Sequence, residues 1–243
     1  MILSRQTIPN EKPVDEIILL ASVQRVLVLS GTGTPLLYIL VYTKTTGQQV
    51  HFFTLPSLDP VNIKPIRHII CMAVDQVHME RPPPSSNAPV EPVHFCAIKR
   101  NAIGMYSIRG DRLLFMKVRC KVFQRSLTYS FQEIPLPNGA IMAKRSGFTL
   151  CIADKNDYQV IDLENASALP VIQVSQAIDP LPFIVTPSIT VIDRSEFLLL
   201  SYTGASTLGL FITSGGDPVR GTLEWPQHPL SLSASFAFYM VLH

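Results

Sequence analysis

The sequence predicts an all-β protein, built as a β-propeller of four-stranded blades. Short segments that are apolar or alternate between apolar and polar residues are separated by Gly, Pro, Asn and Asp turns. No segment keeps the i, i+3, i+4 apolar spacing of a helix over several turns. The 20 prolines among 243 residues suit many short strands with sharply marked ends. We expect roughly twenty strands, which at four strands per blade gives about five blades.

The N-terminal half begins with a segment rich in Ile and Val, Asp15 to Ser30. Its polar centre predicts two short strands joined at Ser22 to Arg25. A further strand is expected at Val50 to Thr54, and Arg67 to Asp75 opens a new unit. The proline-rich stretch Arg81 to Pro89 is expected to be a surface loop; the less common alternative is a ligand for a proline-binding module.

The middle of the chain predicts a regular series of strands with a hairpin-type turn at Asn138-Gly139. The expected strands are Val93 to Lys99, Ala102 to Arg109, Arg112 to Val118, Tyr129 to Ile134, Ile141 to Lys144, Phe148 to Ala153 and Tyr158 to Leu163.

The C-terminal segment shows one repeat unit most clearly. Glu196 to Tyr202 is almost continuously apolar, as a strand buried on both faces would be, and Leu208 to Thr213 is a second apolar strand. Ser214 to Pro218 supplies the glycines and the proline of a turn. Val219 to Trp225 alternates, which predicts an outer strand with one face in solvent. A last strand begins at Phe236.

This segment resembles the citron homology (CNH) domain, with its G-x-F-I strand, G-G-x-P turn and R-G-x-L-x-W-P strand. The residues that carry the resemblance, in structural roles, are Gly209, Phe211, Gly215, Gly216, Pro218, Arg220, Trp225 and Pro226. Within that family the chain looks like the vacuolar-sorting tether subunits, the fungal relatives of TGF-β receptor-associated protein. Val50 to Leu58 and Phe148 to Leu163 agree with this. The resemblance implies an N-terminal arm at 1–13 and a CNH propeller domain at 14–243.

The resemblance also implies a function. Such subunits belong to CORVET-type endosomal and vacuolar tethers, in which the CNH propeller precedes an α-solenoid and helps to bind a Rab GTPase. We therefore expect a protein-binding platform without a cofactor. Its partners would be a Rab-type GTPase and other tether subunits, and it would be cytoplasmic and peripheral on endosomal or vacuolar membranes through those partners. The alternatives are a CNH regulatory module of a kinase or Rho exchange factor, and a propeller hydrolase or lyase with a site at the central channel.

Bulk properties exclude several other classes of protein. The net charge of +2 gives no reason to expect a nucleic acid or an anionic membrane as partner. The N-terminus lacks the apolar core of a signal peptide, and no apolar run approaches the ~20 residues that span a bilayer. The cysteines Cys71, Cys96, Cys120 and Cys151 lie far apart, so we expect reduced core thiols and no metal site.

No residue pattern predicts catalysis. The sequence contains neither G-x-S-x-G nor H-E-x-x-H, and His51 and His94 lie inside expected strands, where core or edge positions are the ordinary explanation. Gly31-Thr32-Gly33 is expected to mark a turn. Arg109-Gly110-Asp111 spells an adhesion tripeptide, but its position between two expected strands predicts a hairpin turn. Asn165-Ala166-Ser167 is a glycosylation sequon, which has no role without secretion. We therefore expect no enzyme.

Three further expectations concern charge and completeness. A modest basic cluster would be a solvated face or a contact with an acidic partner or lipid headgroups; it consists of Arg112, Lys117, Arg119, Lys121 and Arg125. The segment Gly31 to Gln48 interrupts a hairpin that is tight in the family, and we expect an insertion or translated non-coding sequence. The chain stops within a strand, which predicts a fragment that forms an open arc or an imperfectly closed ring. The sequence identifies no residues that would contact the GTPase.

Overall fold

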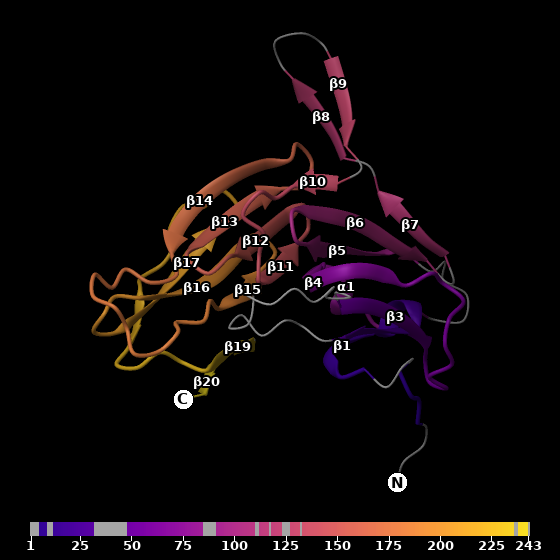
Figure 1. The fold of residues 1–243 in the computed structure, drawn as a ribbon, viewed down its shortest axis with the longest axis horizontal. Helices are drawn as coiled ribbons and strands as arrows, with labels where there is room; N and C mark the ends of the chain where they lie inside the picture. The colour runs from indigo at the N-terminus through magenta and orange to yellow at the C-terminus, as the bar shows by residue number, and fades with distance from the viewer. Residues whose placement is uncertain are drawn as a thin grey trace, which may run out of the picture.

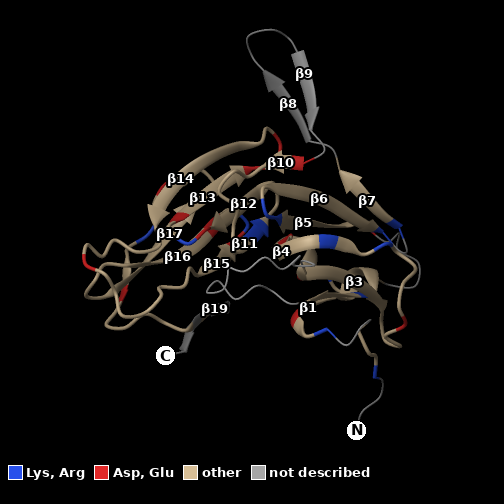
Figure 2. Ribbon diagram, in the orientation of Figure 1, with Lys and Arg blue, Asp and Glu red and all other residues tan. Residues whose placement is uncertain are grey.

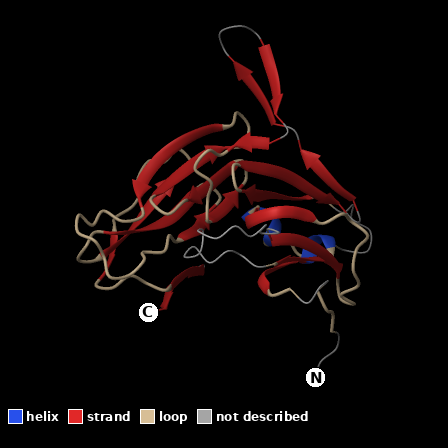
Figure 3. Cartoon of the chain, viewed as in Figure 1, coloured by secondary structure: helices blue, strands red, loops and turns tan. Residues whose placement is uncertain are grey.

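The computed structural model describes residues 5–8, 12–31, 48–84, 91–109, 112–116, 118–122, 127–131, 133–235 and 238–242. The all-β prediction is confirmed, since these ranges contain strands β1 to β20, one short helix α1 (Gln76–Met79) and one 3-10 turn η2 (Ala21–Val23) (Figure 3). The strands are β1 (Val14–Leu20), β2 (Arg25–Ser30), β3 (Gln48–Thr54), β4 (Ile66–Val74), β5 (Val93–Lys99), β6 (Ala102–Arg109), β7 (Arg112–Met116), β8 (Val118–Val122), β9 (Leu127–Phe131), β10 (Glu133–Pro135), β11 (Met142–Ser146), β12 (Thr149–Ala153), β13 (Asp157–Asp162), β14 (Ser167–Gln173), β15 (Ile189–Asp193), β16 (Glu196–Tyr202), β17 (Thr207–Thr213), β18 (Leu223–Trp225), β19 (Ser231–Ser235) and β20 (Phe238–Leu242).

Antiparallel sheets stand side by side in an arc, as the blades of a propeller do (Figure 1). Blade 3 consists of β11 to β14 and blade 4 of β15 to β18, each with its strands in sequence order. The first strands of neighbouring blades contact one another, β4 with β11 and β11 with β15, and therefore form the inner side of the arc. A two-stranded sheet, β19 with β20, follows blade 4.

Blades 1 and 2 are joined in one eight-stranded sheet because β4 serves both of them. Residues 66–69 of β4 pair with β3 and form the fourth strand of blade 1. Residues 71–74 pair with β5 and form the inner strand of blade 2. The change occurs at an irregularity between Ile69 and Cys71, next to His68, whose φ is +61°. The unit that the sequence predicts to open at Arg67 is thus the passage from one blade to the next.

The outer position of blade 2 is divided between two strands. β7 pairs with residues 105–109 of β6, and β10 pairs with residues 102–104. Between them β8 and β9 pair with each other and project from the arc (Figure 1). The single strands predicted at Arg112 to Val118 and at Tyr129 to Ile134 are therefore wrong. Strand-like residues continue through both junctions, so the sequence does not reveal where the chain leaves the sheet.

Three apolar layers hold the blades together. One lies between blades 1 and 2 and includes Leu27 and Phe95, and the next lies between blades 2 and 3 and includes Cys96 and Ile152. The third lies between blades 3 and 4 and includes Cys151. Neighbouring residues of one strand, such as Cys151 and Ile152, thus enter different layers. This explains why the central strands are continuously apolar, since both of their faces are buried.

Blade 4 contains the residues that carry the CNH resemblance. Gly209 lies under the indole of Trp225, where an added Cβ would come within 2.6 Å of a ring carbon. The Arg220 side chain forms an ion pair with Glu196 at 2.6 Å, and its guanidinium lies 5.4 Å from the centre of the buried Phe211 ring. The Trp225 contact holds the outer strand β18 against β17, and the Arg220 contacts hold the segment before that strand against β16 and β17.

The turn before the outer strand packs against blade 3. Gly216 has a φ of +85°, and a Cβ there would lie 2.9 Å from a methyl group of Leu169 in β14. Gly215 donates its N–H to the Thr213 hydroxyl at 3.1 Å, and Pro218 forms an isolated bridge with Ile212. The turn therefore brings the outer edges of blades 3 and 4 together.

Two other expectations need correction. The alternating strand predicted at Val219 to Trp225 is shorter, because only Leu223–Trp225 forms a ladder and Pro226 follows it. The chain bulges between Val219, which donates its N–H to Phe211, and Leu223. Asn138-Gly139 lies in the connection between blades 2 and 3 and is no hairpin, because β10 and β11 belong to different sheets. Gly139, with a φ of +70°, instead passes close to the Arg100 carbonyl.

We expect the close contact between Gly209 and Trp225 to be sensitive to a single methyl group. Gly209→Ala should lower the free energy of unfolding by about 1–3 kcal/mol, because the indole must move to admit the Cβ. Urea unfolding and the fluorescence of Trp225, the 1 tryptophan of the chain, measure both effects. Gly221→Ala is the matched control, since a Cβ there meets nothing within 4 Å. Equal stability of the two variants would contradict the role assigned to Gly209.

Candidate functional site

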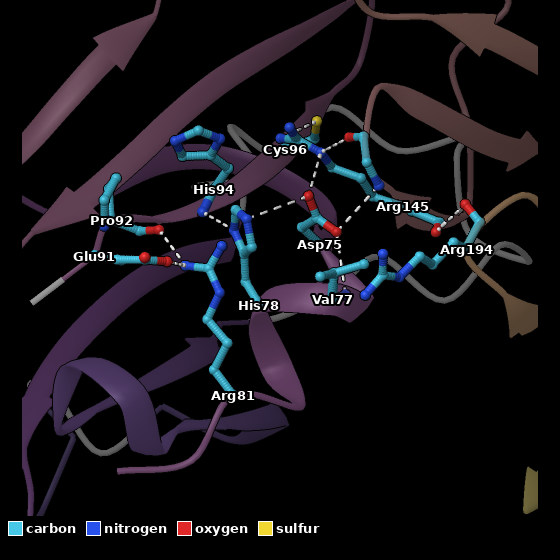
Figure 4. Close-up of polar contacts among 12 residues, drawn as sticks. Asp75, Val77, His78, Arg81, Glu91, Pro92, His94, Cys96, Arg145 and Arg194 are labelled. Atoms are coloured by element: carbon cyan, nitrogen blue, oxygen red, sulfur yellow. Dashed lines mark hydrogen bonds and ion pairs between the residues drawn. The ribbon is translucent and has the colours of Figure 1, made fainter. Parts of the chain in front are cut away.

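A cluster of polar side chains lies buried where the inner strands of blades 2 and 3 end (Figure 4). We call it the inner-end cluster. Its members are Asp75 at the end of β4, His78 in α1, His94 and Cys96 in β5, and Arg145 in β11. Asp75 and Arg145 are both almost fully buried, although ionised side chains are seldom found at such positions unless they are paired.

Asp75 is the centre of this cluster. One of its carboxylate oxygens, Oδ1, accepts hydrogen bonds from the N–H of Val77 at 3.2 Å and from the N–H of Gly147 at 3.1 Å. The first bond caps α1, and the second reaches the β11–β12 turn of blade 3. The other oxygen, Oδ2, lies 4.0 Å from Nε of Arg145 and 3.7 Å from Nε2 of His78. One carboxylate therefore connects blade 2 to blade 3.

Arg145 occupies the other side of the junction. Its Nε donates to the Gly147 carbonyl at 2.9 Å, and Nη1 lies 3.7 Å from Sγ of Cys96. The next residue, Ser146, donates its hydroxyl to the Arg194 carbonyl at 2.6 Å and so extends the contacts to blade 4. The guanidinium thus balances the charge of Asp75 and also contacts the Gly147 carbonyl and the Cys96 thiol.

The two histidines are held neutral. Nδ1 of His78 accepts the backbone N–H of His94 at 2.9 Å, and the two rings lie 5.0 Å apart. Burial lowers the pKa of His78 to about 4; Asp75 opposes this, while Arg81, His94 and Arg145 reinforce it. Burial, followed by the positive charge of Arg145, also lowers the pKa of His94. A proton on Nδ1 of His78 would break its bond to His94.

The contacts of the inner-end cluster are structural: they join α1, β5 and blade 3. A cysteine nucleophile needs a thiolate, and burial raises the pKa of the Cys96 thiol although Arg145 acts in the opposite direction. A general base needs a free acceptor, but the Nδ1 of His78 is already occupied. Beside the cluster lies a cleft of ≈ 270 Å³, lined by Gln76, Val77, Glu80, Ser146, Val191, Ile192, Asp193 and Arg194. No nucleophile with an adjacent base lines this cleft in the described part of the chain.

The candidates from the sequence are scattered over the fold. His51, on β3, is half-buried, and burial lowers its pKa. Cys96 and Cys151 are free thiols in the core, as expected, whereas Cys71 is partly exposed and the side chain of Cys120 lies outside the described residues. Gly31 has a φ of +139°. Residues 32–47, which include the remainder of the predicted turn at Gly31-Thr32-Gly33, lie outside the described residues.

The short motifs lie at connections between strands. Arg109 faces Arg112 where β6 turns back into β7, while Gly110 and Asp111 lie outside the described ranges. Asn165 lies in the turn between β13 and β14 and donates to Asp162 at 2.6 Å. The basic cluster is divided between β7, which carries Arg112, and the projecting β8, which carries Arg119 and Lys121; Lys117 and Arg125 are not described.

Among the described residues, no three His, Cys, Asp or Glu side chains are grouped as a metal site would require. Within the same ranges, neither helical segment has the length or the apolar composition needed to cross a membrane.

A second feature lies at the opposite end of the strands. The long connection from β14 to β15 and the β16–β17 turn meet there (Figure 1). Four large apolar side chains of this region are exposed. We call this the blade 4 loop surface and define it by Ile178, Phe183, Ile184 and Leu230. Sequence reasoning did not identify it. The signal was present as the apolar residues between Ala177 and Pro187, but periodicity cannot show which of them face solvent.

We expect the Asp75–Arg145 pair to be essential for stability. Arg145→Met should lower the free energy of unfolding by about 3–5 kcal/mol, because it leaves the buried carboxylate of Asp75 without its counter-charge. Arg220→Met is the control, since it breaks an exposed ion pair that contributes about 1 kcal/mol or less. Urea unfolding followed by circular dichroism gives both values. The double variant Asp75→Asn with Arg145→Met should lose less than the two single losses combined; strict additivity would rule out the pairing.

We also expect stability to fall in mild acid. The folded-state pKa of His78, about 4, lies below its ordinary value of 6.5, so the unfolded chain binds the proton more readily in between. Stability should therefore decrease by about 2 kcal/mol from pH 7 to pH 5, with His94 acting in the same direction. His78→Asn keeps an acceptor for the His94 N–H but does not titrate, and it should flatten this dependence. An unchanged slope in melts of that variant would show that other groups are responsible.

Comparison with known proteins identifies the family to which the chain belongs. The family described as "VPS3 N-terminal domain" matches residues 86–243. The "Vacuolar protein sorting-associated protein 3" of Saccharomyces cerevisiae (strain ATCC 204508 / S288c) is 22% identical over 154 residues, which cover 61% of this chain and 14% of that protein. The chain thus spans a small part of the length of this relative.

Two solved structures are similar to this chain at lower sequence identity. The "AfRom2 CNH domain" is 15% identical with a TM-score of 0.49, and the similarity covers 95% of this chain and 64% of that one. The uncharacterised protein lmo1340 of Listeria monocytogenes EGD-e is 8% identical with a TM-score of 0.39, over 96% of this chain and 77% of that one. Because the family match covers more than half of the sequence, the chain belongs to the VPS3 N-terminal domain family.

Proposed function

We propose that the chain is a protein-binding platform of a vacuolar sorting tether and takes part in recognising a Rab-type small GTPase. The observation that carries the proposal is the match of residues 86–243 to the VPS3 N-terminal domain family. The name of the yeast relative refers to vacuolar protein sorting and agrees with this assignment. Other tether subunits would be further partners, and the chain would reach endosomal or vacuolar membranes through its partners.

The architecture suits a platform. The inner-end cluster and the apolar layers between blades hold the strands in place, and they leave the loops at the opposite end exposed. Binding residues are commonly placed on loops that a rigid scaffold positions. Apolar side chains at such loops favour a protein partner over a small molecule, because soluble proteins seldom expose several large apolar groups together without a use for them.

A GTPase-binding platform must distinguish two states of its partner. The γ-phosphate orders the switch regions of a GTPase, and hydrolysis releases them. A partner that binds only the ordered form must therefore gain differential affinity from those regions. The low net charge of +2 indicates that long-range attraction contributes little to this affinity, so its dependence on salt should be modest.

The decisive experiment presents the immobilised chain to a panel of Rab and Rho GTPases, each loaded with a GTP analogue or with GDP. We expect weak binding of a Rab GTPase with a preference for the GTP form of at least about tenfold, which corresponds to about 1.4 kcal/mol. Preference for a Rho GTPase would instead support the regulatory module of a kinase or exchange factor. Absence of nucleotide-dependent binding across the whole panel would overturn the proposal.

A further inference from the structure

We propose that the blade 4 loop surface contacts the GTPase, and that it accepts an apolar protein surface flanked by basic side chains. This inference rests on the proposed function and adds to it the part of the chain that is used and the chemistry of the partner's surface. Three observations carry it: the exposure of apolar side chains, the contacts that hold their loops in place, and the charges around them.

Four large apolar side chains on the loops at this end of blade 4 are exposed. Ile178 is 100% exposed, Leu230 73%, Ile184 68% and Phe183 46%. The same connection also sends Leu181 and Val185 into the layer between blades 3 and 4. It therefore buries part of its apolar content and directs the rest outward. Exposed apolar groups of this size, gathered on neighbouring loops, mark a surface that another protein covers.

The loops are held in place before any partner binds. The backbone of Tyr202 donates to the Val174 carbonyl at 3.0 Å and accepts from the Gln176 N–H at 2.7 Å. Its ring meets that of Phe183 edge-on, with 5.5 Å between the ring centres. Tyr202 thus anchors the start of the β14–β15 connection by its backbone and the centre of that connection by its side chain.

His228 fastens the segment that carries Leu230. Its Nε2 lies 2.9 Å from the Thr186 carbonyl, which can only accept, so this nitrogen donates. The Nδ1 then accepts the Thr207 hydroxyl at 3.2 Å. The ring also packs edge-on against Tyr202, with 6.4 Å between the ring centres. Loops that are fixed in this way lose little conformational freedom on binding, which favours affinity for a rigid partner.

The charges around the surface are mostly negative (Figure 2). The adjoining loops and the end of β18 carry four carboxylates and one ammonium group: Asp154, Asp157, Asp179, Glu224 and Lys155. An anionic membrane would be repelled by this rim, because binding to such membranes depends on clustered Lys and Arg. A protein surface with an apolar centre and basic side chains around it would be complementary in both respects.

The test uses the GTPase and nucleotide state that bind the unaltered chain in the panel experiment. Ile184→Asp combined with Leu230→Asp places two charges on the blade 4 loop surface, and we expect at least about tenfold weaker binding. Asp179→Lys reverses a charge at the rim and should weaken binding about threefold or more, with the effect decreasing at high salt. Phe148→Asp is the matched control. Phe148 is 56% exposed but lies in the β11–β12 turn at the other end of blade 3, and binding should be unchanged.

The outcomes distinguish the surface from the function. Urea midpoints first establish that the variants, whose altered side chains are exposed, remain as stable as the unaltered chain. Loss of binding in the loop variants with full binding of the control supports the inference. Full GTP-dependent binding by the loop variants would leave the proposed function intact and show that the GTPase docks elsewhere. A panel without any nucleotide-dependent binding would overturn both the proposed function and this inference. Capture of the chain by phosphatidylserine vesicles through Ile184 and Leu230 would overturn the assignment to a protein partner.

Discussion

The structure depends on burying both faces of each four-stranded sheet against its neighbours. A sheet with two apolar faces is insoluble by itself, and stacking the blades removes those faces from water. The strands of blade 3 show this best, since successive residues such as Cys151 and Ile152 enter the layers on opposite sides. On blade 1 only one face meets another blade in the described ranges. Part of its other face packs under Ile8, Leu55 and Leu58, while Ile17 and Leu19 stay exposed.

Apolar packing alone would allow the blades to slide, and the polar contacts at the inner ends fix their positions. Hydrogen bonds have preferred lengths and directions, whereas apolar contact is largely non-directional. Asp75 reaches the N–H of Gly147 across the junction of blades 2 and 3, and Ser146 reaches the Arg194 carbonyl in blade 4. Burying the charges of Asp75 and Arg145 costs solvation, which their attraction and hydrogen bonds offset. At the outer edge the fit of Leu169 over Gly216 adds a steric constraint.

Local patterns in the sequence predicted most of the fold. The two strands around η2, the continuously apolar β16 and the glycine-rich turn after β17 all follow from composition and spacing. The projecting hairpin β8–β9 was not predicted, because its strand residues continue those of β7 and β10. β14 was also missed: its side chains are mostly exposed and it contains Pro170, so neither an apolar run nor clean alternation marks it. Pairing with β13 decides its conformation, and pairing is a tertiary property.

The polar cluster and the loop surface could not be predicted for a related reason. Asp75 and Arg145 are far apart in sequence, and either residue alone would be expected on a solvated face. The folded chain brings them together through a parallel bridge and an ion pair. The exposed residues of the loop surface are likewise apolar, and composition would have assigned them to the core.

In both features residues lie where their type is seldom found, with charged side chains buried and apolar side chains exposed. Both features depend on the propeller as a framework. The charged pair lies at one end of the strands, where it fixes the blades, and the apolar loops lie at the other. The buried charges that stabilise the fold and the exposed apolar residues available for binding therefore lie at different ends. The loop residues can change to suit a partner without disturbing the contacts that hold the blades together.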